Sequence, residues 1–374
     1  MVKTDSKFMR LALRLAQKGY GATSPNPMVG AVLVKHGAII GRGWHRRAGR
    51  PHAEIEALLD AEKRGHSPRG ATLFVTLEPC CTHGRTPPCT EAIKAAGIKR
   101  VVVGAIDPNP NHAGKGFALL KRAGIKVETG ILARECELVN ETFNHWIVNR
   151  TPFVTVKAAM TLDGKIATAS GESKWITGER ARAYGMKLRQ GSDAILVGVN
   201  TILADNPSLT WRPASSAKAQ KESPRLRRIV LDSQARTPLE AKVVSDAFAG
   251  LTIIVVTDRA PKVRVRALAQ RVAVLVAPSR EAKIDLTWLL KKLGAEQVTS
   301  LLVEGGGEVN ASFLLGGMAQ RVAFFYAPKI LGGRAARKGV AGDGAKSLSE
   351  VVQLQAVVWR KLGEDLLLTA RVAS

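Results

Sequence analysis

The sequence predicts an α/β protein made of two domains, residues 1–148 and 149–374. The chain has 374 residues, whereas a single hydrophobic core tends to stop growing at about 250–300 residues. Apolar segments of strand length alternate with helical patterns through the first half, and the alternation starts again after Asn149-Arg150-Thr151-Pro152. Strands that alternate with helices are typical of a sheet covered by helices, so we expect each half to form its own α/β unit.

In the first half, apolar spacing and turn residues define the elements. A helix is expected from Phe8 to Lys18, because Gly19-Tyr20-Gly21 ends the helical pattern. Two strands, 29–34 and 38–41, should form a hairpin around residues 35–37. The later elements are a helix over 54–64, a strand over 71–77, a helix running from Pro87 to Ala96 with Thr86 as its N-cap, and a strand over 101–106.

The second half reads as a series of short buried strands. They are expected over 154–160, 194–199, 228–232, 251–256, 272–277, 300–304 and 322–326. The stretch 213–225 is polar and poor in apolar residues, so we expect a surface loop there.

Composition limits the classes of function. No apolar run approaches the ~18 residues that span a bilayer, and the first residues mix both charges without an apolar block, so we expect a cytoplasmic protein that does not bind membranes. The net charge of +25 favours either nucleic acid or a phosphorylated small molecule as the partner. Three of the four cysteines lie within ten residues, which indicates a metal site rather than a disulfide framework.

The cysteine-rich segment contains the ligands for such a site. His52, Cys80 and Cys89 supply one imidazole and two thiolates, which leaves the fourth position of a tetrahedral zinc open for water. Residues two apart on a helix point about 200° apart, so His52 and Glu54 can face one metal only if the helix starts at 52–54. Taken singly, a cysteine or a histidine is ordinary packing. The joint pattern H-A-E followed by P-C is typical of zinc nucleobase deaminases.

At this point the first half resembles a known family. The segments SPNPMVGAVLV, GRGWH, GRPHAEIEAL, TLEPC, GRTPPC, and DPNP with GKG are similar to the deaminase domain of the bacterial bifunctional riboflavin-biosynthesis deaminase/reductases. The resemblance implies a cytidine-deaminase-like α/β/α fold and zinc-dependent attack of water on C2 of a diaminopyrimidinone, with Glu54 as the catalytic proton shuttle. It also implies substrate contacts from Asn26, His45 and Arg85.

One departure from the family affects the substrate site. The family usually has a histidine two residues after the first zinc cysteine, where this chain has Thr82, followed by His83. Two interpretations stay open: His83 replaces that histidine through a small loop shift, or the contact is missing.

The second half carries a glycine-rich turn between a strand and a helix. Gly305-Gly306-Gly307 would let the backbone approach an anion at the helix N-terminus, although such turns also serve tight packing. The turn does not match G-x-G-x-x-G, so the ordinary Rossmann fingerprint is missing.

The order of several segments resembles the reductase domain of the same family. These are KxAxxLDGKIA, GxSxWIT, DAILVGxxTxLADxP, LTxR, Asp232-Ser233 and VEGGG. The resemblance implies a dihydrofolate-reductase-like α/β domain that uses NADPH. The implied substrate contacts are Ser173, Arg189, Leu209, Arg212 and Glu304. The implied cofactor contacts are Met160, Trp175, Thr201, Asp205, Ser233, Gly306, Gly307 and Glu308.

We therefore expect a bifunctional riboflavin-biosynthesis enzyme. The resemblance implies deamination of 2,5-diamino-6-(5-phosphoribosylamino)pyrimidin-4(3H)-one, then reduction of the ribosyl side chain to give 5-amino-6-(5-phosphoribitylamino)uracil. Arg189 and Arg212 suit the substrate phosphate, because guanidinium groups match phosphate oxygens.

The rival class of function is a nucleic-acid enzyme. The eight-residue spacing between the cysteines and the low aromatic content of 5% argue against it. A protein that kept the fold but lost one activity is a third reading. The sequence does not determine the oligomeric state, and a homo-oligomer is one possibility.

Overall fold

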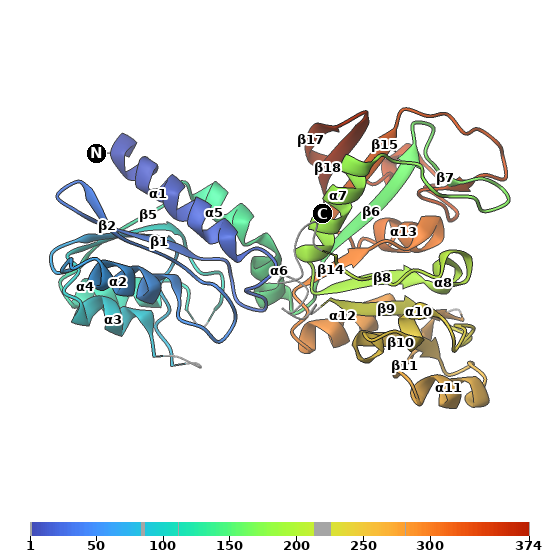
Figure 1. Ribbon diagram of the computed structural model, residues 1–374, viewed down its shortest axis with the longest axis horizontal. Coiled ribbons are helices and arrows are strands. Elements are labelled where there is room, and N and C mark those ends of the chain that lie inside the picture. Colours follow the sequence, from blue (N-terminus) through green and yellow to red (C-terminus); the bar gives the residue numbers. More distant parts are fainter. Residues whose placement is uncertain (1, 84–86, 111, 213–225, 281, 374) are drawn as a thin grey trace. The chain divides into compact units, whose positions relative to one another are not determined.

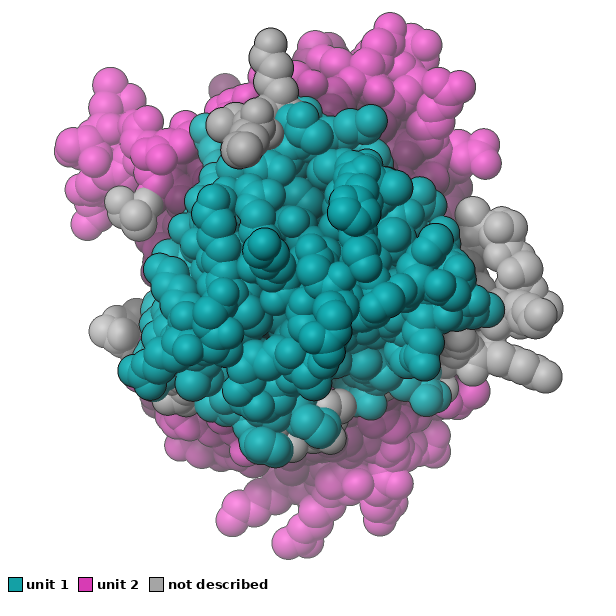
Figure 2. Space-filling model, turned by 90° about the vertical axis from the view of Figure 1, so that its left-hand side faces the viewer, with its two compact units in different colours: residues 1–150 teal, residues 151–374 magenta. Residues whose placement is uncertain are grey.

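The computed structural model describes residues 2–83, 87–110, 112–212, 226–280 and 282–373. The chain forms two compact units, residues 1–150 and 151–374, which are coloured separately in Figure 2. The loop expected over 213–225 lies outside the described residues. Within the described segments, none of the helices combines the length and the apolarity needed to cross a bilayer.

Unit 1 is a five-stranded sheet between two helical layers (Figure 1). The strand order is β2-β1-β3-β4-β5, in which β3, β4 and β5 are parallel and β1 is antiparallel to both of its neighbours. The strands are β1 Gly30–Lys35, β2 Ala38–Trp44, β3 Thr72–Leu77, β4 Arg100–Ala105 and β5 Lys126–Thr129. The helices are α1 Val2–Ala16, α2 Ala53–Lys63, α3 Cys89–Ala95, α4 Lys115–Arg122, α5 Ala133–Val139 and α6 Glu141–Asn149.

Two hydrophobic clusters hold this sheet, one on each face. The first packs Met9 and Ala12 of α1 and Cys136 of α5 on one face of the strands. The second packs α2, α3 and α4 on the opposite face, for example through Ala57 and Leu120. Glycines on β2 permit the close approach of α2, because a Cβ at Gly43 would collide with the backbone of α2.

Unit 2 is built on a nine-stranded sheet of order β11-β10-β9-β8-β14-β6-β15-β18-β17. The strands from β11 to β15 in this order are parallel, and β18 and β17 continue the sheet as an antiparallel hairpin. Its strands are β6 Phe153–Thr161, β8 Ala194–Gly198, β9 Arg227–Leu231, β10 Thr252–Thr257, β11 Ala273–Ala277, β14 Ser300–Val303, β15 Arg321–Ala327, β17 Leu354–Leu362 and β18 Asp365–Val372.

Helices cover both faces of this sheet as well. One face packs against α12 and α13, and most of the other packs against α8, α10 and α11, with α7 over β15 and β18. These helices are α7 Glu179–Gln190, α8 Val199–Asp205, α10 Lys242–Ser245, α11 Lys262–Ala269, α12 Leu286–Ala295 and α13 Gly306–Leu315. Two-residue or three-residue strands complete the unit, namely β7 Lys165–Ala167, β12 Ser279–Arg280, β13 Lys283–Ile284 and β16 Arg337–Lys338.

Most strands lie where the sequence predicted them, but two helix starts were wrong. The first helix begins at Val2, six residues before the expected Phe8, because polar residues at its start weaken the apolar pattern while Asp5 is buried. The helix expected to begin at Pro87 starts at Cys89 with Pro88 as N-cap. A second proline directly after Pro87 moves the start, because the residue before a proline is disfavoured in helical conformation.

Candidate active sites

Three elements of unit 1 bring the predicted metal ligands together. His52 is the N-cap of α2, Cys80 follows the end of β3, and Cys89 is the first residue of α3. The Nδ1 atom of His52 lies 3.5 Å from the Sγ atom of Cys80 and 3.3 Å from that of Cys89. All three candidate ligand atoms lie within 4.8 Å of one another. One imidazole and two thiolates at this spacing fit zinc, with one tetrahedral position left for water.

The electrostatics of this cluster favour one thiolate and a protonatable carboxyl. Hydrogen bonds from Cys89 and from His52 lower the pKa of Cys80 to about 4. The hydrogen bond with Cys80, and then burial, raise the pKa of Cys89. Glu54 is buried and interacts with the Cys89 side chain. Burial, and then the charge of Cys80, raise its pKa to about 7. A carboxyl that titrates near neutrality is suited to take up and release a proton.

Asn26 and His45 lie on one side of the cluster. The His45 ring packs edge-on against His52 with 5.2 Å between centroids, and its Nδ1 lies 3.1 Å from the carbonyl oxygen of Pro51. Its Nε2 lies 3.1 Å from the side-chain nitrogen of Asn26. Burial lowers the pKa of His45, which favours the neutral ring. His83 is exposed, and the predicted substrate contact Arg85 lies outside the described residues.

In unit 2 the predicted residues gather at one edge of the sheet. The parallel strands β6, β14, β8 and β9 are consecutive neighbours, so their carboxyl ends meet at the same edge. Ligands of open α/β sheets bind outside this edge. The predicted residues at or just beyond these strand ends are Met160, Thr201, Ser233, Glu304, Gly306, Gly307 and Glu308. Gly306 begins α13 with a φ of +75°, a conformation that glycine adopts without strain.

A partly buried charge cluster lies at the centre of that edge. The carboxylate of Glu304 accepts hydrogen bonds from Nε and Nη2 of Arg189 at 3.0 and 3.1 Å, and from Nζ of Lys157 at 3.4 Å. The third guanidinium nitrogen of Arg189 donates to the carbonyl oxygen of Thr210. Burial opposes the ionisation of Glu304, but the two cations outweigh it and lower its pKa to about 2. Arg189, which was expected to bind a phosphate, thus forms an ion pair with a carboxylate.

The other predicted residues of unit 2 differ in their surroundings. Ser173 donates a hydrogen bond to Asp205 over 3.4 Å, so the structure brings these two together. Trp175 is 65% exposed, with the Arg182 guanidinium 4.7 Å from its ring centroid. Leu209 is buried. Arg212 is exposed, and no ion pair of it with another described residue is found.

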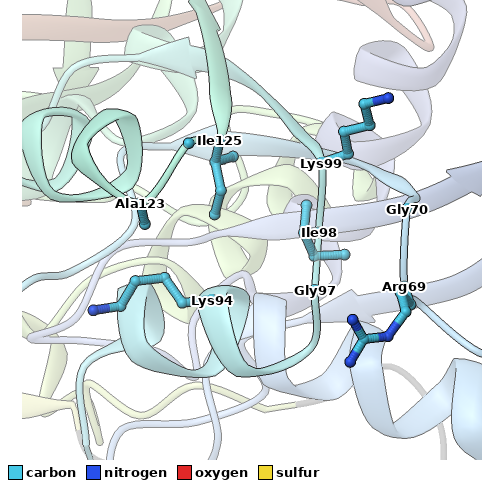
Figure 3. A pocket seen from close by; sticks show the side chains of 9 residues that line it. Arg69, Gly70, Lys94, Gly97, Ile98, Lys99, Ala123 and Ile125 are labelled. Atoms are coloured by element: carbon cyan, nitrogen blue, oxygen red, sulfur yellow. The ribbon is translucent and has the colours of Figure 1, made fainter.

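A shallow hollow in unit 1 lies at the opposite edge of the sheet from the zinc ligands. It is lined at the amino ends of β3 and β4 by Arg69, Gly70 and Lys99, with Lys94 from α3. Figure 3 shows the amines of Lys94 and Lys99 pointing away from one another. Because its cations diverge, this basic hollow does not form a site for one anion.

Comparison with known proteins supports the domain types predicted for both halves of the chain. Residues 152–368 match the family described as the RibD C-terminal domain, and residues 2–105 match the cytidine and deoxycytidylate deaminase zinc-binding region. The chain is 45% identical to the riboflavin biosynthesis protein RibD of Actinobacillus pleuropneumoniae, over 99% of this chain and 96% of that protein. The chain belongs to the RibD family. It is also 40% identical to RibD of Escherichia coli strain K12, covering 97% of this chain and 98% of that one.

Solved RibD structures agree with the fold. Acinetobacter baumannii RibD, form 1, superposes with a TM-score of 0.88 at 35% identity and full coverage of both chains. A Thermotoga maritima protein described as a diaminohydroxyphosphoribosylaminopyrimidine deaminase and 5-amino-6-(5-phosphoribosylamino)uracil reductase gives 0.85 at 36% identity, covering 100% of this chain and 99% of that one. These matches confirm the predicted fold class, and the chain is a bifunctional deaminase and reductase of riboflavin biosynthesis.

Sequence reasoning gave no role to two charged residues near the sites. Lys157 contacts Glu304, and a lysine inside an otherwise apolar strand was the available signal. Glu78 precedes Pro79-Cys80 and is buried. Its carboxylate accepts hydrogen bonds from the backbone nitrogens of Gly114 and Gly116 at 2.9 and 3.0 Å. These partners lie more than thirty residues along the chain, so local spacing could not indicate them.

Proposed function

We propose that unit 1 deaminates 2,5-diamino-6-(5-phosphoribosylamino)pyrimidin-4(3H)-one, and that unit 2 then reduces the ribosyl side chain to ribityl with NADPH. The observation that carries the first step is the convergence of His52, Cys80 and Cys89 next to the buried Glu54. Zinc held by these three ligands would act as a Lewis acid that lowers the pKa of a bound water. The assignment agrees with the substrate named for the Thermotoga maritima relative.

Glu54 is the acid and base of the deamination. Its carboxylate takes a proton from the attacking water and passes it to the amino group that leaves as ammonia, so the overall reaction consumes water and releases ammonia. A pKa of about 7 permits both transfers at neutral pH. The Asn26 and His45 pair lies beside the ligands, and we assign it to substrate binding together with Arg85.

We infer that unit 2 binds and orients the substrate and NADPH. It does not transfer protons through an acidic side chain with an adjusted pKa. NADPH would supply the hydride, as is general for nicotinamide chemistry. We place it at the carboxyl edge of the sheet, against Thr201, Ser233 and the Gly306–Gly307 turn. Arg189, Arg212 and Glu304 face the substrate in this proposal, with Ser173 and Leu209 beside it. The remaining assigned cofactor contacts are Met160, Trp175, Asp205 and Glu308. The cytoplasmic location, the lack of specific nucleic-acid binding and the oligomeric state stay predictions.

The test compares Glu54→Gln with Cys80→Ala in zinc content and deamination rate. Glu54→Gln should keep zinc and lose about 10²–10⁴-fold in rate, the usual contribution of a general acid or base. Cys80→Ala should lose the metal. Glu56→Gln is the matched control, since Glu56 lies on the same helix and pairs with Arg46 instead. Equal zinc loss in Glu54→Gln and Cys80→Ala, or full activity of Glu54→Gln, would contradict the assignment.

A further inference from the structure

A cysteine and a histidine outside the ligand set face each other beside the zinc cluster. Cys81 directly follows the ligand Cys80, and its Sγ atom lies 3.6 Å from the Nδ1 atom of His112. His112 belongs to the loop between β4 and α4. This loop therefore places an imidazole next to the metal-binding segment, although His112 is far from it in sequence.

Residues near both ends of the loop are bonded to Glu78, two residues before the candidate ligand Cys80. The buried carboxylate of Glu78 accepts hydrogen bonds from the backbone nitrogens of Asp107, Gly114 and Gly116, at 3.3, 2.9 and 3.0 Å. A Cβ at Gly116 would collide with the carbonyl oxygen of Pro79, so the loop also packs closely on the segment. Because Glu78 binds both ends of the loop, His112 is held at a defined place beside Cys81.

The contact with Cys81 leaves the other ring nitrogen available. His112 is partly exposed, and its Nε2 has no hydrogen-bond partner among the described residues. When Nδ1 accepts from a thiol, the neutral ring carries its proton on Nε2, so this nitrogen becomes a donor. Lys115, the first residue of α4, follows with its side chain exposed, and its backbone nitrogen donates to the carbonyl oxygen of His112 at 2.6 Å.

A ring donor on the loop and an ammonium on the first residue of α4 suit an anion. The backbone nitrogens of residues 114–116 cannot bind it, because those of Gly114 and Gly116 donate to Glu78 and that of Lys115 donates to the carbonyl oxygen of His112. In the substrate of the proposed function the pyrimidinone and the ribose are neutral, and only the phosphate is anionic. Charge complementarity therefore matches the loop to the phosphate end of the substrate.

We propose that His112, assisted by Lys115, binds the substrate phosphate at the deaminase site. This inference rests on the proposed function and assigns a specificity residue within it. His112 would then supply the imidazole for which the family usually has a histidine at the position of Thr82. The exposed His83, considered above for that role, is not needed.

Two amide substitutions at His112 distinguish phosphate binding through Nε2 from the contact of Nδ1 with Cys81. The side-chain nitrogen of glutamine can approximate Nε2 of histidine, and that of asparagine can approximate Nδ1. If Nε2 binds phosphate, His112→Gln should stay close to wild type in KM for deamination. His112→Asn and His112→Ala should raise KM about tenfold, the smaller end of what a charge-assisted hydrogen bond contributes. The opposite order, with asparagine active and glutamine impaired, would assign His112 to holding Cys81 and would overturn the proposal.

Substrate and second-site variants complete the test. With the same pyrimidine lacking its phosphate, His112→Ala and wild type should have equal kcat/KM. Thr82→His should recover most of the KM loss in the His112→Ala background, while His83→Ala and the exposed control His66→Ala should match wild type. Zinc content should be unchanged in each variant. An equal loss with the unphosphorylated substrate would overturn the inference. A wild-type protein that does not deaminate the phosphorylated substrate at all would instead overturn the proposed function, and this inference with it.

Discussion

The two sites shift the pKa of a glutamate in opposite directions. In unit 1, burial and the neighbouring Cys80 raise the pKa of Glu54 to about 7. In unit 2, Arg189 and Lys157 outweigh the effect of burial and lower the pKa of Glu304 to about 2. Glu54 can therefore exchange a proton at neutral pH, while Glu304 stays an anion. The difference supports the proposal that Glu54 carries the proton transfers of the deamination, whereas the charges of unit 2 hold ligands and neighbouring side chains in place.

Removing the metal should separate the two activities most strongly. We expect a chelator to lower deamination by about 10³-fold or more, because a Lewis acid contributes several kcal/mol to the transition state. Reduction of the deaminated intermediate should not change, because the predicted ligands His52, Cys80 and Cys89 all belong to unit 1. Both rates are measured before and after dialysis against the chelator, and again after zinc is restored. If the chelator also lowered the rate of reduction, the two activities would not differ in their dependence on the metal.

Breaking the charge cluster should have the next largest effect. Glu304→Gln leaves Arg189 and Lys157 without their carboxylate, which we expect to cost about 3 kcal/mol in the free energy of unfolding. Loss of charge-assisted contacts should also lower reduction by about 100-fold. Denaturant unfolding and the rate of NADPH oxidation measure the two effects. Glu296→Gln is the control, because Glu296 forms a partly exposed ion pair with Arg227 and should cost less than about 1 kcal/mol.

The pH dependence of stability should follow Glu304. Its pKa is about 2 in the folded protein and 4.5 as the ordinary value. A carboxyl with a lowered folded pKa stabilises the protein fully above its unfolded pKa, and that stabilisation is lost as the pH falls toward the folded pKa. The difference in unfolding free energy between wild type and Glu304→Gln should therefore be largest at neutral pH and shrink between about pH 5 and pH 3. A difference that stays constant over this range would show that Glu304 does not titrate as described.

The sequence predicts the buried strands of the fold well, because their signal is local. The parallel strands β8 and β14 consist almost entirely of buried apolar residues, as expected for strands covered on both faces. The hairpin of β17 and β18 was not predicted. Eight of the nine residues of β17 are exposed, so the strand lacks the alternation by which a half-buried strand is found.

Prediction of the sites from the sequence is also limited to local signals. His52, Glu54, Cys80 and Cys89 stand in short motifs whose residue types indicate zinc chemistry, and the structure brings them together. The contacts that orient the sites are long-range. Arg189 and Glu304 are 115 residues apart. Such pairs depend on which strands become neighbours, and spacing along the chain does not contain that information.

The smallest effect should distinguish the two arginines that the sequence assigned to phosphate. Arg189 is held by Glu304 and by the carbonyl oxygen of Thr210, whereas Arg212 is exposed. Arg212→Ala should therefore raise KM for the reduction about tenfold and leave kcat and stability unchanged, because an exposed guanidinium contributes a charge-assisted contact to the ligand and little to the fold. Arg189→Ala should lower stability as Glu304→Gln does, because it leaves a largely buried carboxylate with Lys157 as its remaining cationic partner. Steady-state kinetics and denaturant unfolding of both variants measure this difference. If Arg212→Ala has no effect and Arg189→Ala changes only KM, then Arg189 binds the phosphate and its pairing with Glu304 is exchanged when substrate arrives.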